Sequence, residues 1–463
     1  MTKNTRLPKD LIISISGIRG IVGQDLNKKT IKILLSGYIK LQGKGLFILA
    51  GDSRSHTPKI QKIVAETLIK TGCDVIDAGI QPTPTVNINV PRFKANGGIM
   101  ISASHNPSEY NGLKFFDKTG HYLDQKKLDK LLSFCQKEYT VFPKTRRGKY
   151  TQNKNIDEAH LDLLEKISDP RIKQKKFKVI VDTINGAGCD FTKKLLTRLG
   201  CEYTIINNDP KKPFPHMPEP NFENLQIVNK KIIGSNFDIG FATDPDCDRI
   251  IILTPKKGVI CEEYSLALSV LRRLKQKPSG AIVINYATSL LNEFITQNTN
   301  FQIIRTAVGE HNVYAKMVEK NAVLAGEGNG GVMDPRLNST RDGFTGIVHI
   351  LSLLARENKT IDEIVDALPK YEIIKDKIPV KGLDLKKIYA NLEKQLYTKN
   401  CQIRRDDGIW IGFMENEKLT SWLLFRPSNT EPIARIIAET SSQKQTRKLI
   451  NLVKNLVQNT KTA

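Results

Sequence analysis

Short apolar runs alternate with amphipathic segments along most of the chain, and this alternation most restricts the fold. In the first third, strand-like runs at Asp10–Ser16 (ending at the glycine that follows), Gly45–Gly51 and Gly98–Ser102 are separated by segments with helical periodicity. Asn27 and Thr57 are placed to cap two of these helices. Buried strands joined by crossover helices form parallel or mixed sheets. The sequence therefore predicts an α/β fold.

The same alternation of strand-like and helix-like segments occurs three times, and the pattern then changes toward the C-terminus. Strand-like runs recur at Phe177–Asp182 and Phe237–Ala242, and again at Ala281–Asn285 and Phe301–Arg305. Toward the end, a long helix at Leu385–Leu396 precedes two strand-like runs and a last helix. The 463 residues suit three or four domains of roughly 100–200 residues. We expect three similar mixed-sheet α/β domains and a smaller C-terminal α+β domain, divided as 1–155, 156–257, 258–370 and 371–463.

The chain carries a formal net charge of +23. Its Lys and Arg residues are spread along the whole sequence, with no single basic tail, zinc finger or aromatic RNA-binding signature. We interpret the charge as solvated lysine-rich surface and expect no nucleic-acid partner. A basic field would still favour capture of a phosphorylated metabolite, and whether the charge has a particular partner is left open.

Several classes of protein are excluded by composition. No apolar run approaches the roughly 20 residues of a membrane helix, and the N-terminus lacks the pattern of a signal peptide. The seven cysteines are scattered and include no C-x-x-C pair, which argues against a disulfide framework or a cysteine zinc site. We expect a cytoplasmic enzyme with no membrane partner.

The first loop whose side chains could take part in catalysis or binding runs from Ile101 to Pro107 and reads ISASHNP. It presents hydroxyl groups directly after a strand, where α/β folds place their ligands, and it is followed by Asn111–Lys114. The alternative is an ordinary capped turn. Ser104 and His105 do not form a hydrolase dyad, because adjacent side chains point in different directions.

The second loop, Thr243–Arg249, reads TDPDCDR and lies between two strand-like runs. Its three carboxylates, Asp244, Asp246 and Asp248, alternate along the chain and suit a hard cation with oxygen ligands. The spacing does not fit an EF-hand, which needs a glycine where Arg249 stands. A solvated acidic turn is the alternative, but like charges so close together favour a metal site.

Two further loops offer hydrogen-bonding groups. The loop Gly326–Gly331 reads GEGNGG, in which Glu327 and Asn329 can bind sugar hydroxyls, with a plain flexible turn as its rival. The loop Arg426–Pro432 reads RPSNTEP and places a guanidinium, two hydroxyls and an amide within five residues. These are donors suited to a phosphate dianion, with a capped turn as the alternative.

Together and in this order, the loops resemble those of the α-D-phosphohexomutase family, which includes phosphoglucomutase, phosphomannomutase and phosphoglucosamine mutase. The resemblance covers nearly the whole chain, starting at Ser16–Gly20 (SGIRG) and including Val181–Gly188. It implies four domains around a central active-site cleft, each contributing one loop. It also implies an isomerase that interconverts hexose 6-phosphate and hexose 1-phosphate.

The resemblance implies a role for each candidate residue. Ser104 would be the phosphoserine and would hold one Mg²⁺ together with Asp244, Asp246 and Asp248. Lys114 would be the general acid/base, which requires a lowered pKa. Arg19, His105 and Arg249 would surround the transferring phosphoryl group. The sugar hydroxyls would be bound by Glu327 and Asn329. The phosphate distant from the reacting oxygen would be bound by Arg426, Ser428, Asn429 and Thr430. A hexose bisphosphate would serve as intermediate and activator, and the chain would be a monomer or homodimer.

The identity of the sugar depends on the regions where this chain departs from the family pattern. Serine is commoner where Asn329 stands, and Val308–Asn312 differs from the glycine-histidine form of some members. The combination of SGIRG with GEGNGG is most similar to divergent phosphoglucosamine mutases, which convert glucosamine 6-phosphate to glucosamine 1-phosphate. The alternatives are phosphomannomutase or phosphoglucomutase, and more distantly a sugar-phosphate phosphatase or a non-catalytic phosphosugar-binding protein.

Overall fold

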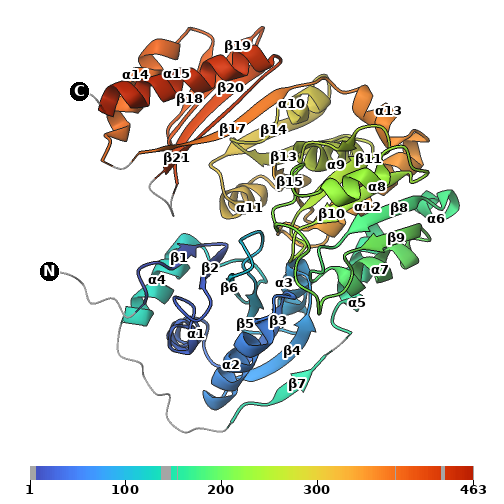
Figure 1. Ribbon diagram of the computed structural model, residues 1–463, viewed down its shortest axis with the longest axis vertical. Helices are drawn as coiled ribbons and strands as arrows, with labels where there is room; N and C mark the ends of the chain where they lie inside the picture. The colour runs from blue at the N-terminus through green and yellow to red at the C-terminus, as the bar shows by residue number, and fades with distance from the viewer. Residues whose placement is uncertain (1–6, 137–146, 154, 381, 429–432, 462–463) are drawn as a thin grey trace. The chain divides into compact units, whose positions relative to one another are not determined.

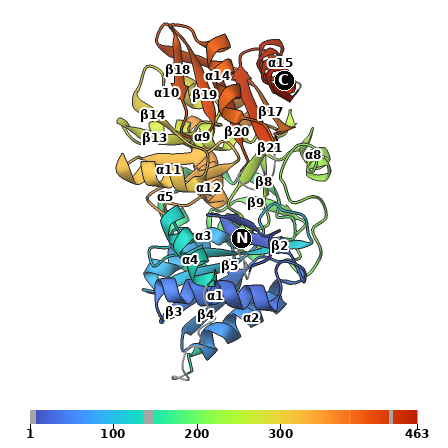
Figure 2. The same cartoon turned by 90° about the vertical axis from the view of Figure 1, so that its left-hand side faces the viewer.

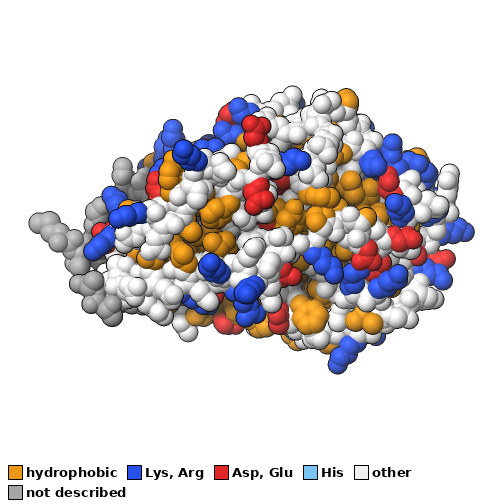
Figure 3. Space-filling view, turned by 90° about the horizontal axis from the view of Figure 1, so that it is seen from above, with side chains coloured by type: hydrophobic (Ala, Val, Ile, Leu, Met, Phe, Trp, Pro, Cys, Tyr) orange, Lys and Arg blue, Asp and Glu red, His pale blue; other side chains and the backbone are white. Residues whose placement is uncertain are grey.

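The computed structural model describes residues 7–136, 147–153, 155–380, 382–428 and 433–461. The chain divides into two compact units, Met1–Arg272 with Gly330–Asp362, and Arg273–Asn329 with Glu363–Ala463. No helix among the described residues is long and apolar enough to cross a membrane. Lys and Arg side chains are scattered over the face seen in Figure 3, as the sequence predicts.

The first unit opens with a seven-stranded mixed sheet in the order β1-β2-β6-β5-β3-β4-β7. Helices α1 (Lys28–Gln42), α2 (Thr57–Lys70) and α4 (Gln125–Gln136) pack on one face, and α3 (Thr83–Arg92) packs on the other (Figures 1 and 2). Both faces are therefore buried, which explains the near-continuous apolar runs of the central strands. The strands are β1 (Ile12–Ser14), β2 (Gly17–Ile21), β3 (Leu46–Gly51), β4 (Asp74–Ile80), β5 (Gly97–Ile101), β6 (Tyr110–Phe116) and β7 (Tyr150–Gln152).

A second sheet in the same unit has the order β12-β11-β10-β8-β9. Its parallel strands are β8 (Lys178–Asp182), β9 (Glu202–Ile206) and β10 (Ile239–Thr243), and β11 (Ile250–Thr254) and β12 (Gly258–Val259) are antiparallel. The other elements that lie wholly or partly in this unit are α5 (Glu158–Ile167), α6 (Arg171–Lys175), α7 (Cys189–Arg198), α8 (Gln226–Ile232), α9 (Glu263–Leu274), β16 (Gly331–Met333), α12 (Gly343–Glu357) and α13 (Ile361–Asp366).

The second unit contains a further α/β sheet and an antiparallel one. Strand β13 (Ser279–Asn285) lies between β14 (Asn300–Thr306) and β15 (Leu324–Glu327), all parallel, with α10 (Leu291–Thr296) and α11 (Glu310–Glu319) as connections. The antiparallel sheet has the order β17-β21-β20-β19-β18. Its elements are β17 (Glu372–Pro379), β18 (Cys401–Arg404), β19 (Ile409–Glu415), β20 (Lys418–Pro427) and β21 (Ile433–Thr440), with α14 (Leu385–Leu396) and α15 (Gln443–Lys461) on one face.

Three α/β sheets followed by an antiparallel sheet with helices on one face confirm the predicted fold class. The predicted cap of α1 is also confirmed, because the Asn27 side chain accepts hydrogen bonds from the backbone of Lys29 and Thr30. The predicted cap of α2 is wrong: Thr57 is the first helical residue, and its hydroxyl donates to Asp52 instead. The expected end of the first strand at Gly17 is also wrong, because β2 begins there and pairs with β1.

One buried carboxylate joins the two sheets of the second unit. Glu439 on β21 accepts hydrogen bonds from Ser289 Oγ (2.6 Å), the Leu290 backbone N–H (2.7 Å) and Trp422 Nε1 (2.9 Å). Burial raises the pKa of Glu439, and these donors and the nearby Arg305 oppose that effect.

Glu439→Ala is expected to destabilise the second unit by about 3 kcal/mol, because three buried donors lose their acceptor. Glu439→Gln keeps an acceptor in place and is expected to cost less, about 1 kcal/mol. The chain has two tryptophans, Trp410 and Trp422, and both lie in the second unit. Denaturant titration followed by tryptophan fluorescence therefore measures this unit, and an unchanged midpoint for Glu439→Ala would contradict the prediction.

Candidate active site

Ser104 lies in the turn between β5 and β6, at the end of a buried strand. The side chain is 1% exposed, and the backbone is left-handed with φ +50°. Its N–H donates to Ser102 Oγ at 2.8 Å, and Asn106 N–H closes the turn on Ala103 O at 3.1 Å. A left-handed backbone at a serine is sparsely populated and is kept only where neighbouring contacts impose it.

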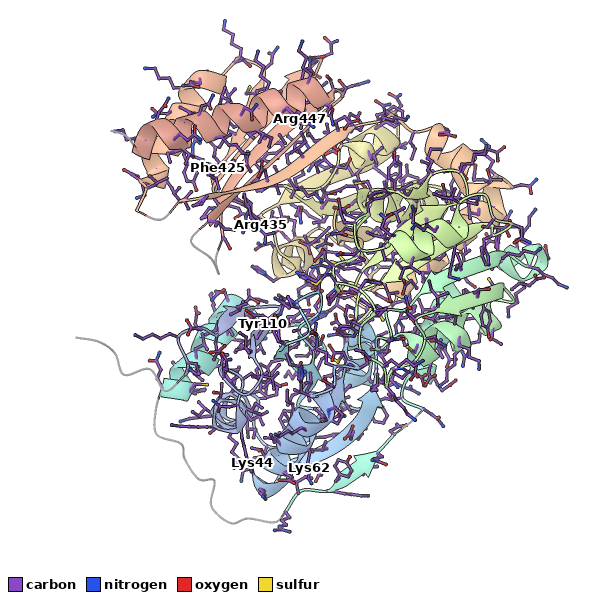
Figure 4. The ribbon with its side chains drawn as sticks, viewed as in Figure 1. Lys44, Lys62, Tyr110, Phe425, Arg435 and Arg447 are labelled. Carbon is purple, nitrogen blue, oxygen red and sulfur yellow. The ribbon has the colours of Figure 1, made fainter. Side chains whose placement is uncertain are left out.

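Those contacts come from Arg54, a buried residue that the sequence analysis missed. Its Nη2 donates to the carbonyl oxygens of Ser104 and Asn106, both at 2.7 Å. Its Nη1 donates to the carbonyls of Pro107 (2.7 Å) and Tyr110 (3.1 Å), the second of which is labelled in Figure 4. Its Nε pairs with Asp52 Oδ2 at 3.1 Å. One guanidinium therefore fixes the course of residues 102–110, here called the serine loop, using the fork geometry that only arginine has.

The SGIRG and NGLK motifs meet as neighbouring strands. β2 and β6 pair antiparallel, with Arg19 opposite Gly112 and Ile18 opposite Leu113. A Cβ atom at position 112 would lie 2.8 Å from Arg19 Cγ, so the glycine leaves space for the arginine side chain. Arg19 Nη1 donates to Asn106 Oδ1 at 2.9 Å, which brings this guanidinium to the serine loop.

The three aspartates form a buried cluster between β10 and β11. Ligand atoms of Asp244, Asp246 and Asp248 lie within 4.8 Å of one another. Cys247, in the same turn, has φ +61°. Burial, reinforced by the other two carboxylates, raises the pKa of Asp244 well above its usual range. Ser104 Oγ donates to Asp244 Oδ2 at 2.9 Å, so the serine loop and the carboxylate cluster share one site.

This cluster fits a divalent cation. Asp246 Oδ1 and Asp248 Oδ1 are buried and have no hydrogen-bond partner among the described residues. Buried carboxylate oxygens without a hydrogen bond, beside a third carboxylate, are ligands suited to Mg²⁺.

Cationic side chains also reach the cluster. Lys114 Nζ pairs with Asp246 and lies 3.4 Å from Asp248 Oδ2, and Arg341 Nη2 donates to Asp248 Oδ2 at 2.8 Å. Burial lowers the pKa of Lys114, but the carboxylates of Asp246 and Asp248 outweigh it and the net shift is upward. The lowered pKa expected for Lys114 is therefore wrong for this arrangement. Arg341, and the Thr83 hydroxyl that donates to Asp246, were missed by the sequence analysis.

His105 and Arg249 lie at the rim of this site, joined by Glu219. His105 Nε2 is 3.4 Å from Glu219 Oε2, and Arg249 Nη1 donates to Glu219 Oε1 at 3.1 Å. Burial and the neighbouring guanidinium groups of Arg249 and Arg19 lower the pKa of His105 well below its usual range. His105 is therefore neutral at physiological pH, and the positive charge of the rim comes from the arginines. Glu219 lies far from every motif and was not predicted.

The second unit holds the other candidate residues. Glu327, at the end of β15, is 4% exposed and its Oε1 accepts hydrogen bonds from Asn285 Nδ2 (2.8 Å) and Gly309 N–H (3.2 Å). Asn329 Nδ2 lies 3.5 Å from Glu327 Oε2. The loop that carries Glu327 and Asn329, here called the sugar loop, therefore contacts the loop that follows β14 through Gly309.

Arg426 lies near the end of β20, on the sheet face opposite α14 and α15. The preceding residue, Phe425, is fully buried beneath those helices, and successive strand residues point to opposite faces (Figure 4). Arg426 is opposite Arg435 in the β20–β21 pair, and its Nε pairs with Asp407 at 2.8 Å. Ser428 N–H donates to Ile433 O at 2.8 Å. Asn429 and Thr430 lie outside the described residues.

Three family profiles match this sequence. They are those of phosphoglucomutase/phosphomannomutase alpha/beta/alpha domain I at residues 11–141, domain II at 158–258 and domain III at 262–371. A phosphoglucomutase/phosphomannomutase of Thermococcus kodakarensis is 32% identical over 448 residues, covering 94% of this chain and 96% of the relative. The chain belongs to the α-D-phosphohexomutase family. It is therefore a phosphohexomutase, an isomerase that transfers a phosphoryl group within its substrate.

Other relatives agree in length and fold. A phosphoglucosamine/phosphogalactosamine mutase of Sulfurisphaera tokodaii is 31% identical, covering 96% of this chain and 99% of the relative. The crystal structure of a phosphoglucomutase/phosphomannomutase family protein from Burkholderia thailandensis has a TM-score of 0.81 at 24% identity, covering 97% of this chain and 98% of that one. An Aspergillus fumigatus N-acetylphosphoglucosamine mutase, solved with GlcNAc-6P and magnesium, has a TM-score of 0.63 at 14% identity, covering 99% and 97%. These last two likenesses concern the fold alone.

Proposed function

We propose that this phosphohexomutase interconverts glucosamine 6-phosphate and glucosamine 1-phosphate through a phosphorylated Ser104. The observation that carries the proposal is the contact between Ser104 Oγ and Asp244 Oδ2, at 2.9 Å, beside two further buried aspartates. A serine hydroxyl held at a cation site is the equipment for accepting and releasing a phosphoryl group, because phosphoryl transfer depends mainly on positioning and charge neutralisation.

Each unit contributes its own set of residues to the proposed reaction. In the first unit, Ser104 is the nucleophile and Arg19, His105 and Arg249 bind the transferring phosphoryl group. Asp244, Asp246 and Asp248, with an oxygen of phosphorylated Ser104, would hold one Mg²⁺, which when bound neutralises phosphoryl charge. In the second unit, Glu327 and Asn329 bind sugar hydroxyls, and the distant phosphate is bound by Arg426, Ser428, Asn429 and Thr430. The four-domain division expected from the sequence would give one loop to each domain.

The reaction has two transfers. In the first, the bond between phosphorus and Ser104 Oγ breaks and a new P–O bond forms to the free sugar hydroxyl, giving a hexose bisphosphate. Ser104 Oγ takes a proton from the Lys114 ammonium, and the proton of the sugar hydroxyl replaces it. After the bisphosphate has reoriented in the site, the P–O bond to its original phosphate breaks and that phosphoryl group is transferred to Ser104 Oγ. The serine proton passes to Lys114, and the leaving sugar oxygen takes a proton from Lys114 in exchange. The carboxylates of Asp246 and Asp248 keep Lys114 protonated before the transfer, which a proton donor requires.

The choice of glucosamine is supported by two observations. The SGIRG and GEGNGG motifs are most similar to divergent phosphoglucosamine mutases. The Sulfurisphaera tokodaii relative, which aligns over nearly its full length, is a phosphoglucosamine/phosphogalactosamine mutase. The Thermococcus kodakarensis relative is a phosphoglucomutase/phosphomannomutase, and this makes glucose and mannose phosphates the alternative substrates.

A coupled assay of the three 1-phosphates tests the proposal. With Mg²⁺ and a trace of hexose 1,6-bisphosphate, we expect the kcat/KM for glucosamine 1-phosphate to exceed those for glucose and mannose 1-phosphate by about tenfold or more. EDTA is expected to abolish turnover and excess Mg²⁺ to restore it. A preference for glucose or mannose phosphate would overturn the sugar assignment alone, whereas no interconversion of any of the three would overturn the proposed function.

A further inference from the structure

We propose that Asp407 is a positioning residue that couples the phosphate-binding arginine, Arg426, to the segment Val308–Asn312 beside the sugar loop. The inference rests on the proposed function, because it assigns Arg426 to the distant phosphate and Glu327 to the sugar. It goes further in making sugar selection depend on the state of the phosphate site. All the residues concerned lie in the second unit.

The two oxygens of the Asp407 carboxylate have different partners. Oδ1 accepts from Arg426 Nε at 2.8 Å, and Oδ2 accepts from the Val308 backbone N–H at 2.9 Å. The first partner belongs to β20 of the antiparallel sheet, and the second follows β14 of the α/β sheet. The ion pair is largely desolvated, with the Arg426 and Asp407 side chains 12% and 13% exposed. A charge-assisted bond of this kind is stronger and better oriented than an exposed surface pair.

The backbone around Asp407 holds its side chain in place. Asp407 precedes β19, and Gly408 after it has φ +75°. A Cβ atom on Gly408 would lie 2.3 Å from the Phe425 carbonyl oxygen and 2.7 Å from Arg426 Cα. The loop therefore runs directly against the strand that carries Arg426. Because Nε of Arg426 donates to Asp407, a phosphate would be bound through the terminal Nη atoms.

The next residue of the segment is tied to the sugar loop. Gly309 N–H donates to Glu327 Oε1 at 3.2 Å, and Asn312 Nδ2 closes the turn on Val308 O at 3.1 Å. Two consecutive backbone N–H groups therefore donate to two different carboxylates, Asp407 on the phosphate side and Glu327 on the sugar side. A shift of Asp407 moves the peptide that also orients Glu327. Coupling through such a shared element is reciprocal: phosphate binding alters sugar binding as much as sugar binding alters phosphate binding.

Asp407→Asn tests the coupling, and Asp406→Asn is its matched control. Asp406 is the adjacent residue in the same loop, but its carboxylate accepts from Tyr286 Oη (3.0 Å) and not from Arg426 or Val308. For Asp407→Asn we expect KM to rise about tenfold with kcat changed less than about threefold, because ground-state phosphate binding is weakened. We also expect the ratio of kcat/KM between the best and next-best hexose phosphate to fall about fivefold or more. For Asp406→Asn both quantities should stay within about twofold.

A double-mutant cycle with Arg426→Lys separates coupling from a general loss of structure. If Asp407 acts through Arg426, then Asp407→Asn should raise KM less than about twofold further in the Arg426→Lys background. Fully additive effects of the two substitutions on KM would overturn the proposal. So would a folded Asp407→Asn protein in which the ratio of kcat/KM between the best and next-best hexose phosphate is unchanged.

A binding measurement distinguishes failure of this proposal from failure of the proposed function. Calorimetric titration of the magnesium-loaded protein with glucose, mannose and glucosamine 6-phosphates gives three Kd values without turnover. Loss of selectivity among these Kd values in Asp407→Asn, with wild-type selectivity in Asp406→Asn, supports the coupling even if no sugar is interconverted. Equal selectivity in both variants contradicts it.

Discussion

Ser104→Ala is expected to lower kcat for every hexose phosphate by about 10⁴-fold or more, because the variant has no oxygen to carry the phosphoryl group between the two transfers. The fold should be retained, since among the described residues the side chain makes only two hydrogen bonds, to Asp244 Oδ2 (2.9 Å) and His105 Nδ1 (3.4 Å), and the loop is held through backbone carbonyls. Intact-mass measurement should show an acid-stable increment of one phosphate on the wild-type chain, mapped by peptide analysis to Ser104, and none on the variant.

Ser102→Ala is the matched control for this prediction. Ser102 lies two residues earlier in the same loop, and its Oγ accepts the Ser104 N–H at 2.8 Å. Its loss removes an orienting contact and leaves the nucleophile, so we expect about a tenfold fall in kcat and normal phosphorylation. If Ser104→Ala kept turnover while Asp244→Ala lost it, the reaction would not pass through the serine, and a phosphatase that uses an aspartate nucleophile would be favoured.

The sequence predicts the functional residues that belong to a motif, because their side chains are grouped within a few consecutive positions. Three aspartates at alternate positions indicate a cation site before any fold is known, and the structure places them together. Arg54, Arg341 and Glu219 belong to none of the motifs, and their contacts with Ser104, Asp248 and Arg249 join residues that are 50, 93 and 30 positions apart. Nothing local distinguishes such residues from ordinary surface charges, so their contacts appear only once the fold brings the loops together.

The same distinction applies to the fold. Buried parallel strands are visible as apolar runs, and Leu385–Leu396 is predicted with the bounds that the structure shows. Strand β17 follows the predicted domain boundary at residue 370, and only one of its eight residues, Ile378, is buried, so it has no continuous apolar run by which the sequence could show it. The pKa of Lys114 is an equally non-local property. The sequence gives no sign that Asp246 and Asp248, more than 130 positions away, would pair with its ammonium.

Arg54→Ala is expected to lower both the stability of the protein and its catalytic rate. The guanidinium donates to four carbonyl oxygens of the serine loop and neutralises the buried Asp52. Its removal leaves a buried carboxylate without its cation, which should destabilise the protein by about 3–5 kcal/mol. Release of the Ser104 backbone should lower kcat by about 10²-fold, since a displacement of about 1 Å can cost that much. Arg54→Lys restores a charge without the fork, and we expect an intermediate stability with kcat still about 10²-fold low.

The pH dependence and a second substitution separate these two effects of Arg54. Burial raises the pKa of Asp52, and Arg54 opposes the rise, so Arg54→Ala should raise that pKa further. A carboxyl whose folded pKa lies above its unfolded value stabilises the protein below the unfolded value, and this is lost as pH rises through the folded pKa. The stability deficit of Arg54→Ala should therefore shrink as the pH is lowered through this raised pKa.

Adding Asp52→Asn to Arg54→Ala removes the buried charge and should recover much of the unfolding midpoint at neutral pH. It should not recover kcat, because the four carbonyls of the serine loop still lack their donor. If kcat returned together with stability, Arg54 would contribute only to folding, and the geometry of the Ser104 turn would not depend on it.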